Sequence, residues 1–125
     1  MSAADGIVLR VASGPLADAV VRRVVGAVGA QAELPFDRLQ DAGLVTDAIL
    51  DHLDRDQVQI RLGTGTQGLE LAVGPLADGE ADRIIDRSRM PDLGSIIERL
   101  ADRVWIERSD PDEFLCVEVR RTAQG

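Results

Sequence analysis

Three aspartates at helical spacing are the residues of this chain best placed to collect a metal ion. Asp47, Asp51 and Asp54 follow one another at intervals of four and three residues, which puts them on one side of a helix. Their carboxylate oxygens are ligands that Mg²⁺ accepts. The alternative is a solvated acidic face, because like charges at this spacing cost a helix only about 0.2–0.5 kcal/mol each. The solvated face is the commoner outcome for such a run.

Other reactive side chains are few. His52 is the only histidine and Cys116 the only cysteine, so a single chain can form neither a disulfide nor a Cys/His zinc site. All 14 basic residues are arginine, and the absence of lysine excludes a P-loop lysine, a Schiff-base lysine and a Ser-Lys dyad. We expect His52 to have a surface or helix-edge role.

Length and charge narrow the class of protein. A chain of 125 residues has the commonest size of one domain, and we expect a single domain over residues 1–125. A net charge of −8 argues against a nucleic-acid partner, because such proteins gather positive charge on one face. No apolar run reaches the roughly 20 residues that span a bilayer, and no export signal precedes the first strand. We therefore expect a cytoplasmic protein without a membrane partner.

Helical periodicity predicts two long helices after a first strand at residues 7–11. The apolar stripe of the first comprises Ala17, Val20, Val21, Val24 and Val28. The second begins near Asp37, and its stripe comprises Leu39, Ala42, Thr46, Ile49, Leu50 and Leu53.

Alternating apolar and polar residues predict two hairpins. The first joins residues 57–62 to residues 69–73, and its glycine-rich tip connects two strands, whereas a phosphate loop leads from a strand into a helix. The second joins residues 104–107 to residues 114–120. Trp105 either packs in the core or lies on the open face of the sheet as an anchor for a partner, and we expect the core.

The pentapeptide Gly-Pro-Leu-Ala-Asp occurs at residues 14–18 and again at residues 74–78, each time after an apolar run, and it predicts two strand-to-helix junctions. After the second copy we expect a short helix at residues 81–87 and an exposed, mobile break at residues 88–92. A further helix then runs to about Asp102, with Ser95 and Glu98 at capping-box spacing.

Arginines gather in the short helix and the break that follows it. They either meet a phosphate or an acidic partner, or pair with neighbouring acids, and local pairs of this kind are common. The arginines are Arg83, Arg87 and Arg89, and the acids are Glu80, Asp82 and Asp86.

The predicted order of elements is strand, helix, helix, hairpin, short helix, helix and hairpin. Helices segregated from paired strands are typical of an α+β fold. We expect a two-layer sandwich, in which a mixed, mostly antiparallel sheet is covered on one face by helices.

This order, over nearly the whole chain, resembles the histidine-kinase-like ATPase fold, and in particular the anti-sigma factor serine/threonine kinases. Residues 43–52 are similar to the N-box helix of that family, in which a glutamate is the candidate general base and an asparagine four residues later holds magnesium. Gly43 stands in the glutamate place and Asp47 in the asparagine place. The resemblance implies no catalytic residue here, and Asp47 as a metal ligand if Mg-ATP binds.

Two later nucleotide motifs are altered as well. The family carries Asp-x-Gly-x-Gly after the second hairpin strand, and Pro75 and Ala77 stand at its first aspartate and glycine. Asp78-Gly79 lies three residues further on and replaces this motif only if the loop is re-routed. The last motif, Gly-x-Gly before a helix, matches Asp92-Leu93-Gly94, with Gly94 retained. The nucleotide-binding candidates implied by the resemblance are Asp47, Asp51, Asp78, Gly79 and Gly94.

The leading hypothesis is a regulatory domain impaired in ATP binding and phosphotransfer, which binds a sigma factor or an antagonist protein. It requires no cofactor, and Mg-ATP enters only if the nucleotide site is retained. The resemblance also implies a homodimer. One alternative is an active ATP-dependent serine kinase, whose base would be Asp47 or Asp51, and another is a small-ligand or structural interaction domain.

Overall fold

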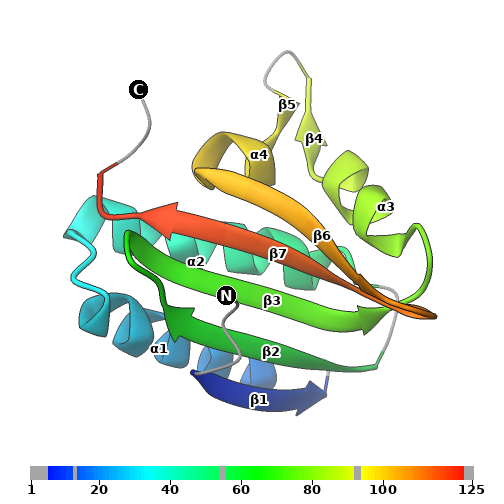
Figure 1. Ribbon diagram of the computed structural model, residues 1–125, viewed down its shortest axis with the longest axis horizontal. Coiled ribbons are helices and arrows are strands. Elements are labelled where there is room, and N and C mark those ends of the chain that lie inside the picture. Colours follow the sequence, from blue (N-terminus) through cyan, green and yellow to red (C-terminus); the bar gives the residue numbers. More distant parts are fainter. Residues whose placement is uncertain (1–5, 13, 54–55, 92–93, 123–125) are drawn as a thin grey trace.

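Five antiparallel strands form the main sheet of the computed structural model, which describes residues 6–12, 14–53, 56–91 and 94–122. The strand order is β1-β2-β3-β7-β6, and each pairing in this sheet is antiparallel (Figure 1). The strands are β1 Ile7–Ala12, β2 Gln57–Thr64, β3 Gly68–Leu76, β6 Arg103–Ser109 and β7 Asp112–Arg120. The predicted α+β class is confirmed, and no parallel pairing occurs among the described strands.

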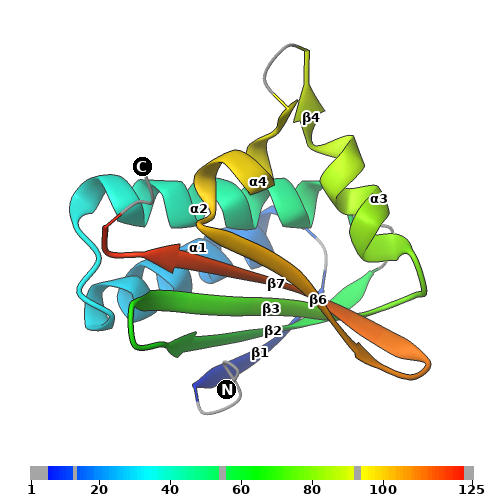
Figure 2. The same cartoon turned by 45° about the horizontal axis from the view of Figure 1, so that its top comes forward.

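The helices cover one face of this sheet and leave the other open, as Figures 1 and 2 show. They are α1 Pro15–Gln31, α2 Phe36–Asp51, α3 Glu80–Arg87 and α4 Ile96–Leu100. Each contributes apolar side chains to the main core, and examples are Val25, Ile49, Ile84 and Ile97. We call the helix-free side of the sheet the open face. No helix in the described part of the chain has both the length and the apolar character needed to cross a membrane.

The second long helix matches its prediction more closely than the first. In α2 the predicted Ala42, Thr46 and Ile49 are buried. In α1 Val21 and Val28 are buried as predicted, but Val20 is 45% exposed. Val25 occupies the core in its place, because the stripe that faces the sheet continues from Val21 through Val25 to Val28.

The two copies of Gly-Pro-Leu-Ala-Asp adopt different structures. In the first copy Gly14 is the N-cap of α1 and proline follows in the first turn, as predicted. The second copy also leads from a strand into a helix, α3, but the expectation that its proline ends the strand is wrong, because Gly74, Pro75 and Leu76 still belong to β3 and the junction lies at residues 77–79. The pairing of β3 with β7 shifts register between Val73 and Leu76 and then resumes at Glu113, so the proline is accommodated at an irregularity of the ladder.

A small hairpin replaces much of the predicted break between α3 and α4. Strands β4 (Arg89–Met90) and β5 (Gly94–Ser95) pair, and the Ser88 hydroxyl lies 2.6 Å from that of Ser95. Arg89, Met90 and Pro91 are exposed as expected, whereas Ser88 is buried. The mobility expected at Asp92 lies outside the described residues. Ser95 is the N-cap of α4, and its side chain accepts a hydrogen bond from the amide of Glu98 at 3.4 Å.

Both predicted β-hairpins are confirmed. The glycine-rich tip joins β2 to β3, and the Gly65 amide donates to the Gly68 carbonyl at 2.7 Å, so it is a connection between strands. The second hairpin joins β6 to β7 through residues 109–112.

Candidate functional site

The two described aspartates of the α2 run lie on the solvent side of the helical layer. Asp47 forms an ion pair with Arg22 of α1, and Asp51 is exposed. Asp54 lies outside the described residues. The Asp47 carboxylate therefore points toward the Arg22 guanidinium. His52 ends the same helix, and its Nδ1 donates to the Ala48 carbonyl at 2.7 Å, which matches its predicted helix-edge role.

Gly43 leaves an unfilled surface one turn before Asp47. A Cβ atom added at Gly43 would meet no other atom within 4 Å. The place that the resemblance gives to a general base is therefore open and carries no side chain.

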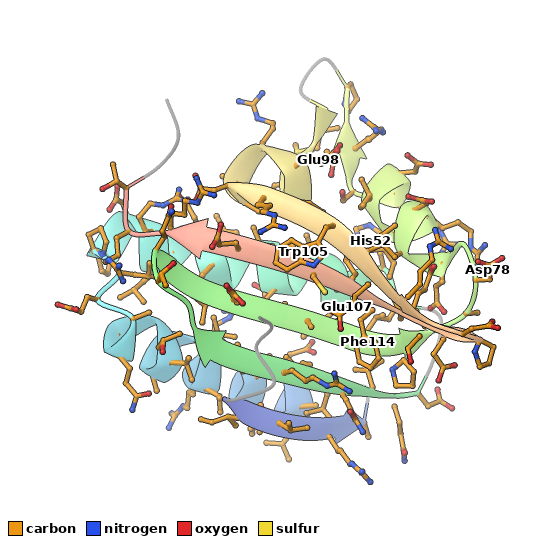
Figure 3. The ribbon with its side chains drawn as sticks, viewed as in Figure 1. His52, Asp78, Glu98, Trp105, Glu107 and Phe114 are labelled. Atoms are coloured by element: carbon orange, nitrogen blue, oxygen red, sulfur yellow. The ribbon has the colours of Figure 1, made fainter. Side chains whose placement is uncertain are left out.

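Asp78 and Gly79 lie at the other end of the predicted nucleotide constellation, in the turn between β3 and α3. Gly79 is the N-cap of α3 with a φ of 80°, a conformation that glycine adopts readily. Asp78 is exposed, and its Oδ1 lies 3.1 Å from Nη1 of Arg108 on β6 (Figure 3). Gly94 has a φ of 76° in β5, while Asp92 and Leu93 lie outside the described residues.

The nucleotide-binding candidates have separate surroundings. Asp47 pairs with Arg22 of α1, whereas Asp78 pairs with Arg108 of β6, so the two carboxylates have different cationic partners on different elements. The described residues include no group of three or more His, Cys, Asp and Glu side chains that could hold a metal ion. Asp47 would have to share its carboxylate between Arg22 and an ion.

Among the arginines after the second pentapeptide, Arg89 pairs with nearby acids, as the local-pairing alternative predicted. Its guanidinium lies 3.3 Å from Asp86 and 3.6 Å from Glu98. Both pairs are exposed, so each contributes at most about 1 kcal/mol to stability.

A buried carboxylate that the sequence did not single out lies beside this turn. Glu113 of β7 is 2% exposed, and its Oε1 accepts a hydrogen bond from the Ala81 amide at 3.0 Å. Its Oε2 lies 3.4 Å from Nη1 of Arg108. Glu113 thus satisfies an amide in the first turn of α3 from a neighbouring strand. Its neighbours in the turn at residues 109–112 are polar, which hid the inward side chain.

The open face carries a second, smaller apolar cluster. Ala72, Phe114 and Cys116 are buried there, and Trp105 packs against them. The expectation that Trp105 is a core residue is wrong, because Val104 and Ile106 are the side chains of β6 that reach the main core. Figure 3 shows Trp105, Glu107 and Phe114 together over β6 and β7.

Arginine side chains cover the two aromatic rings of this cluster. The guanidinium carbon of Arg61 lies 4.3 Å from the centroid of Phe114, and that of Arg103 lies 4.3 Å from the centroid of Trp105. Both distances are typical of cation–π contacts. The open face therefore presents guanidinium groups above a shallow apolar layer.

Beside Arg10 the open face is hollowed. A shallow hollow of about 230 Å³ is lined by residues of β1, β2 and β3, namely Arg10, Gln57, Val58, Gln59 and Pro75. A second hollow of about 110 Å³ lies at the start of α1, between Asp18 and Asp56, and Leu50 and Leu53 form its apolar wall.

Cys116 lies beneath these side chains as a shielded thiol. Burial raises its pKa to about 12, and the nearby negative charge of Glu107 adds to the increase. A thiol with so high a pKa stays protonated at neutral pH and is a poor nucleophile. Cys116 is therefore a packing residue of the open-face cluster.

No protein-family model and no curated protein matches the chain. The functional assignment therefore depends on the arrangement of its residues.

Proposed function

We propose that this protein is a regulatory, protein-binding domain similar to the anti-sigma factor kinases, which lacks effective ATP binding and phosphotransfer and binds a sigma factor or an antagonist protein. The observation that carries the proposal is the pairing of Asp47 with Arg22. This carboxylate stands where the family holds magnesium, and here it already has a cationic partner.

Two further positions support the same function. Gly43 offers no side chain to accept a proton in the place of the family's glutamate. Pro75 continues β3 in the place of the adenine-reading aspartate, and proline has neither an acceptor side chain nor an amide proton. The nearest aspartate, Asp78, is exposed and pairs with Arg108. An ATP site would need rearrangement at all of these positions.

The open face supports protein binding as the remaining activity. No helix within the described ranges covers it, and it displays Trp105 and two arginine–aromatic pairs. Tryptophan and arginine are enriched among residues that dominate binding energy at protein interfaces.

Thermal unfolding in the presence of Mg-ATP tests the proposal. A ligand at about one hundred times its dissociation constant stabilises a protein by roughly 2.7 kcal/mol. We expect no shift of Tm with 10 mM Mg-ATP, Mg-ADP or Mg-GTP, relative to MgCl₂ alone. A stabilisation that saturates with Mg-ATP concentration would overturn the impaired-binding proposal and favour the kinase alternative.

Capture of partners from the source cell tests the protein-binding half. We expect a sigma factor or an antagonist protein to be retained equally with and without Mg-ATP, because binding does not depend on nucleotide. Retention only with Mg-ATP, or transfer of phosphate to a serine of the captured protein, would identify an active kinase.

A further inference from the structure

We infer that one corner of the open face binds an acidic, extended peptide segment of the partner protein, an inference that rests on the proposed protein-binding function. We call this surface the arginine corner and define it by Arg10, Gln57, Gln59, Arg61 and Pro75. Four of these residues line the hollow of about 230 Å³, and Arg61 lies two residues beyond Gln59 on β2, on the same face of the sheet. The side chains come from three adjacent strands, so the sheet holds them in fixed relative positions.

Both arginines of the corner face away from the helices. Arg10 alternates with Leu9 and Val11, which pack against the main core, so its side chain is on the open face. Arg61 is placed on the same face by its contact with the Phe114 ring.

Neither guanidinium is neutralised by a carboxylate of the described residues. Among the residues that the structure describes, Arg10 and Arg61 form no ion pair with a carboxylate. The chain has 22 acidic residues against 14 arginines, so carboxylates are plentiful elsewhere. Of the glutamates on the open face, Glu107 and Glu118 lie on β6 and β7, outside the corner. Glu70 lies on β3, diagonal to Arg61 in the register, and forms no ion pair with it. The corner is thus a cationic site on an anionic protein.

The spacing of the two arginines fits an extended peptide. Arg10 is opposite Gln59 and Val8 is opposite Arg61, so the arginines are diagonal neighbours on an antiparallel pair. Diagonal neighbours lie about 7–8 Å apart. Alternate side chains on one face of an extended peptide are about 7 Å apart, because each residue advances about 3.3 Å. These distances apply to the backbone positions, and the Arg61 side chain extends from β2 toward β7, where its guanidinium lies over the Phe114 ring. A peptide with acidic side chains at alternate positions along its length can therefore place one beside each guanidinium group.

The remaining surface suits a peptide rather than an isolated anion. Gln57 and Gln59 supply amide donors and acceptors beside Arg10, as a peptide backbone requires. Pro75 and the edge of the Phe114 and Trp105 cluster offer apolar contact for a side chain between the acids. The Phe114 ring already holds the Arg61 guanidinium in place, so little side-chain freedom is lost on binding.

The overall charge favours an acidic peptide over a nucleic acid. A chain with net charge −8 repels a phosphate backbone over the whole approach path, and two arginines are fewer than such backbones usually engage. A short acidic segment needs only a local cationic site.

Peptide titration tests the inference with a reporter that the chain already contains. Trp105 is the only tryptophan and lies in the adjoining cluster. We expect blocked nonapeptides with Asp or Glu at alternate positions, and Val or Leu between them, to change its fluorescence saturably. Affinity should fall as NaCl is raised, because the contacts are exposed charge pairs. Peptides with Asn and Gln in place of the acids should bind at least tenfold more weakly.

Matched charge variants locate the site. The Arg10→Gln and Arg61→Gln substitutions should each weaken acidic-peptide binding at least fivefold, and the double substitution more than tenfold. The control is Arg23→Gln on α1, an exposed arginine that also has no carboxylate partner among the described residues, and it should change affinity less than twofold. The exposed position of Arg10 keeps this test independent of folding, and circular dichroism would verify Arg61→Gln.

Several results would overturn the inference. One is the absence of peptide binding at millimolar concentration, and another is an equal loss of affinity for Arg10→Gln and Arg23→Gln. The inference would also be wrong if peptide-induced amide shifts in NMR spectra mapped to the helical layer, or if an oligonucleotide bound more tightly than any acidic peptide.

Failure of the proposed function can be distinguished from failure of this inference. A partner captured equally by the native chain and Arg10→Gln would leave protein binding intact and refute the arginine corner, whereas Mg-ATP binding would refute the function without involving this face.

Discussion

The guanidinium of Arg38 donates to the carboxylate of Asp102 in a part of the molecule where both side chains are buried, with exposed fractions of 8% and 4%. Arg38 lies in the first turn of α2, and its Nε also donates to the Arg120 carbonyl at 2.9 Å. Asp102, which precedes β6, accepts from the Arg120 amide at 2.7 Å. This pair joins the start of a helix, the end of β7 and the segment that leads into β6.

Removal of one partner of this pair should strongly destabilise the fold. Asp102→Ala removes one of the two carboxylates that pair with the buried Arg38 guanidinium, the other being Asp41, and it also removes the acceptor of the Arg120 amide. We therefore expect a loss of about 3 kcal/mol, the lower end of the range for a broken buried pair. The measurement is urea denaturation followed by circular dichroism. The matched control is Asp47→Ala, which breaks the more exposed pair with Arg22 and should cost about 1 kcal/mol or less. Equal losses for the two variants would contradict a structural role specific to Asp102.

The Arg38 pair also illustrates what the sequence could not reveal. Helical periodicity correctly placed Ala42 and Ile49 in the core, because apolar spacing is a local property. Arg38 interrupts that apolar pattern and is nevertheless buried. One partner, Asp41, is local at the i+3 position, but the Asp102 carboxylate and the Arg120 carbonyl lie more than 60 residues away. Only the tertiary fold brings these two distant acceptors to it.

The sheet shows a second limit of the same kind. Residues 104–106 are all apolar, so alternation identifies two faces of β6 without saying which is covered. Val104 and Ile106 turned out to face the helices, and Trp105 was left on the open face. The arginine corner was equally hidden, because it assembles from three strands that only the pairing of the sheet places side by side.

Alanine substitutions at two glycines should change the stability of the protein in opposite directions. Gly43→Ala adds a methyl group to open space in the middle of α2, and it should stabilise the protein by about 0.8–1 kcal/mol because alanine favours the helix. Gly68→Ala at the start of β3 would place Cβ 2.2 Å from the Val119 carbonyl oxygen. Backbone atoms must then move apart, with a cost of about 1–3 kcal/mol. Urea midpoints that shift the same way in both variants would contradict the predicted packing.

Loss of the N-cap of α4 should destabilise the protein by more than the short length of this helix suggests. Ser95→Ala removes the acceptor for the Glu98 amide and the contact with the Ser88 hydroxyl, so we expect a loss of about 1–2 kcal/mol. Ser88 keeps its bond to the Ile85 carbonyl, which limits the damage. Native-state hydrogen exchange should show faster exchange in α4 than in α2. A control substitution at the exposed Thr66 should leave both helices unchanged.

Alkaline pH should destabilise the protein through one side chain. Below pH 9 the Cys116 thiol is protonated in the folded and unfolded chains alike. Between pH 9 and about pH 12 the unfolded chain loses this proton while the folded chain keeps it, because burial raises the folded pKa. The unfolded state then binds fewer protons, so the free energy of unfolding falls by about 1.4 kcal/mol for each pH unit and by about 4 kcal/mol in all.

The composition of the chain leaves few other side chains that titrate between pH 9 and pH 12. It contains no lysine and no tyrosine, and its arginines remain charged throughout the window. We therefore expect Cys116→Ala to abolish the decline of stability between pH 9 and pH 12, although the variant itself is less stable at pH 7 because the thiol fills a packed site. Urea denaturation at half-unit pH steps provides the comparison. A decline of equal size in Cys116→Ala would assign the alkaline transition to another part of the molecule and refute the role of the thiol.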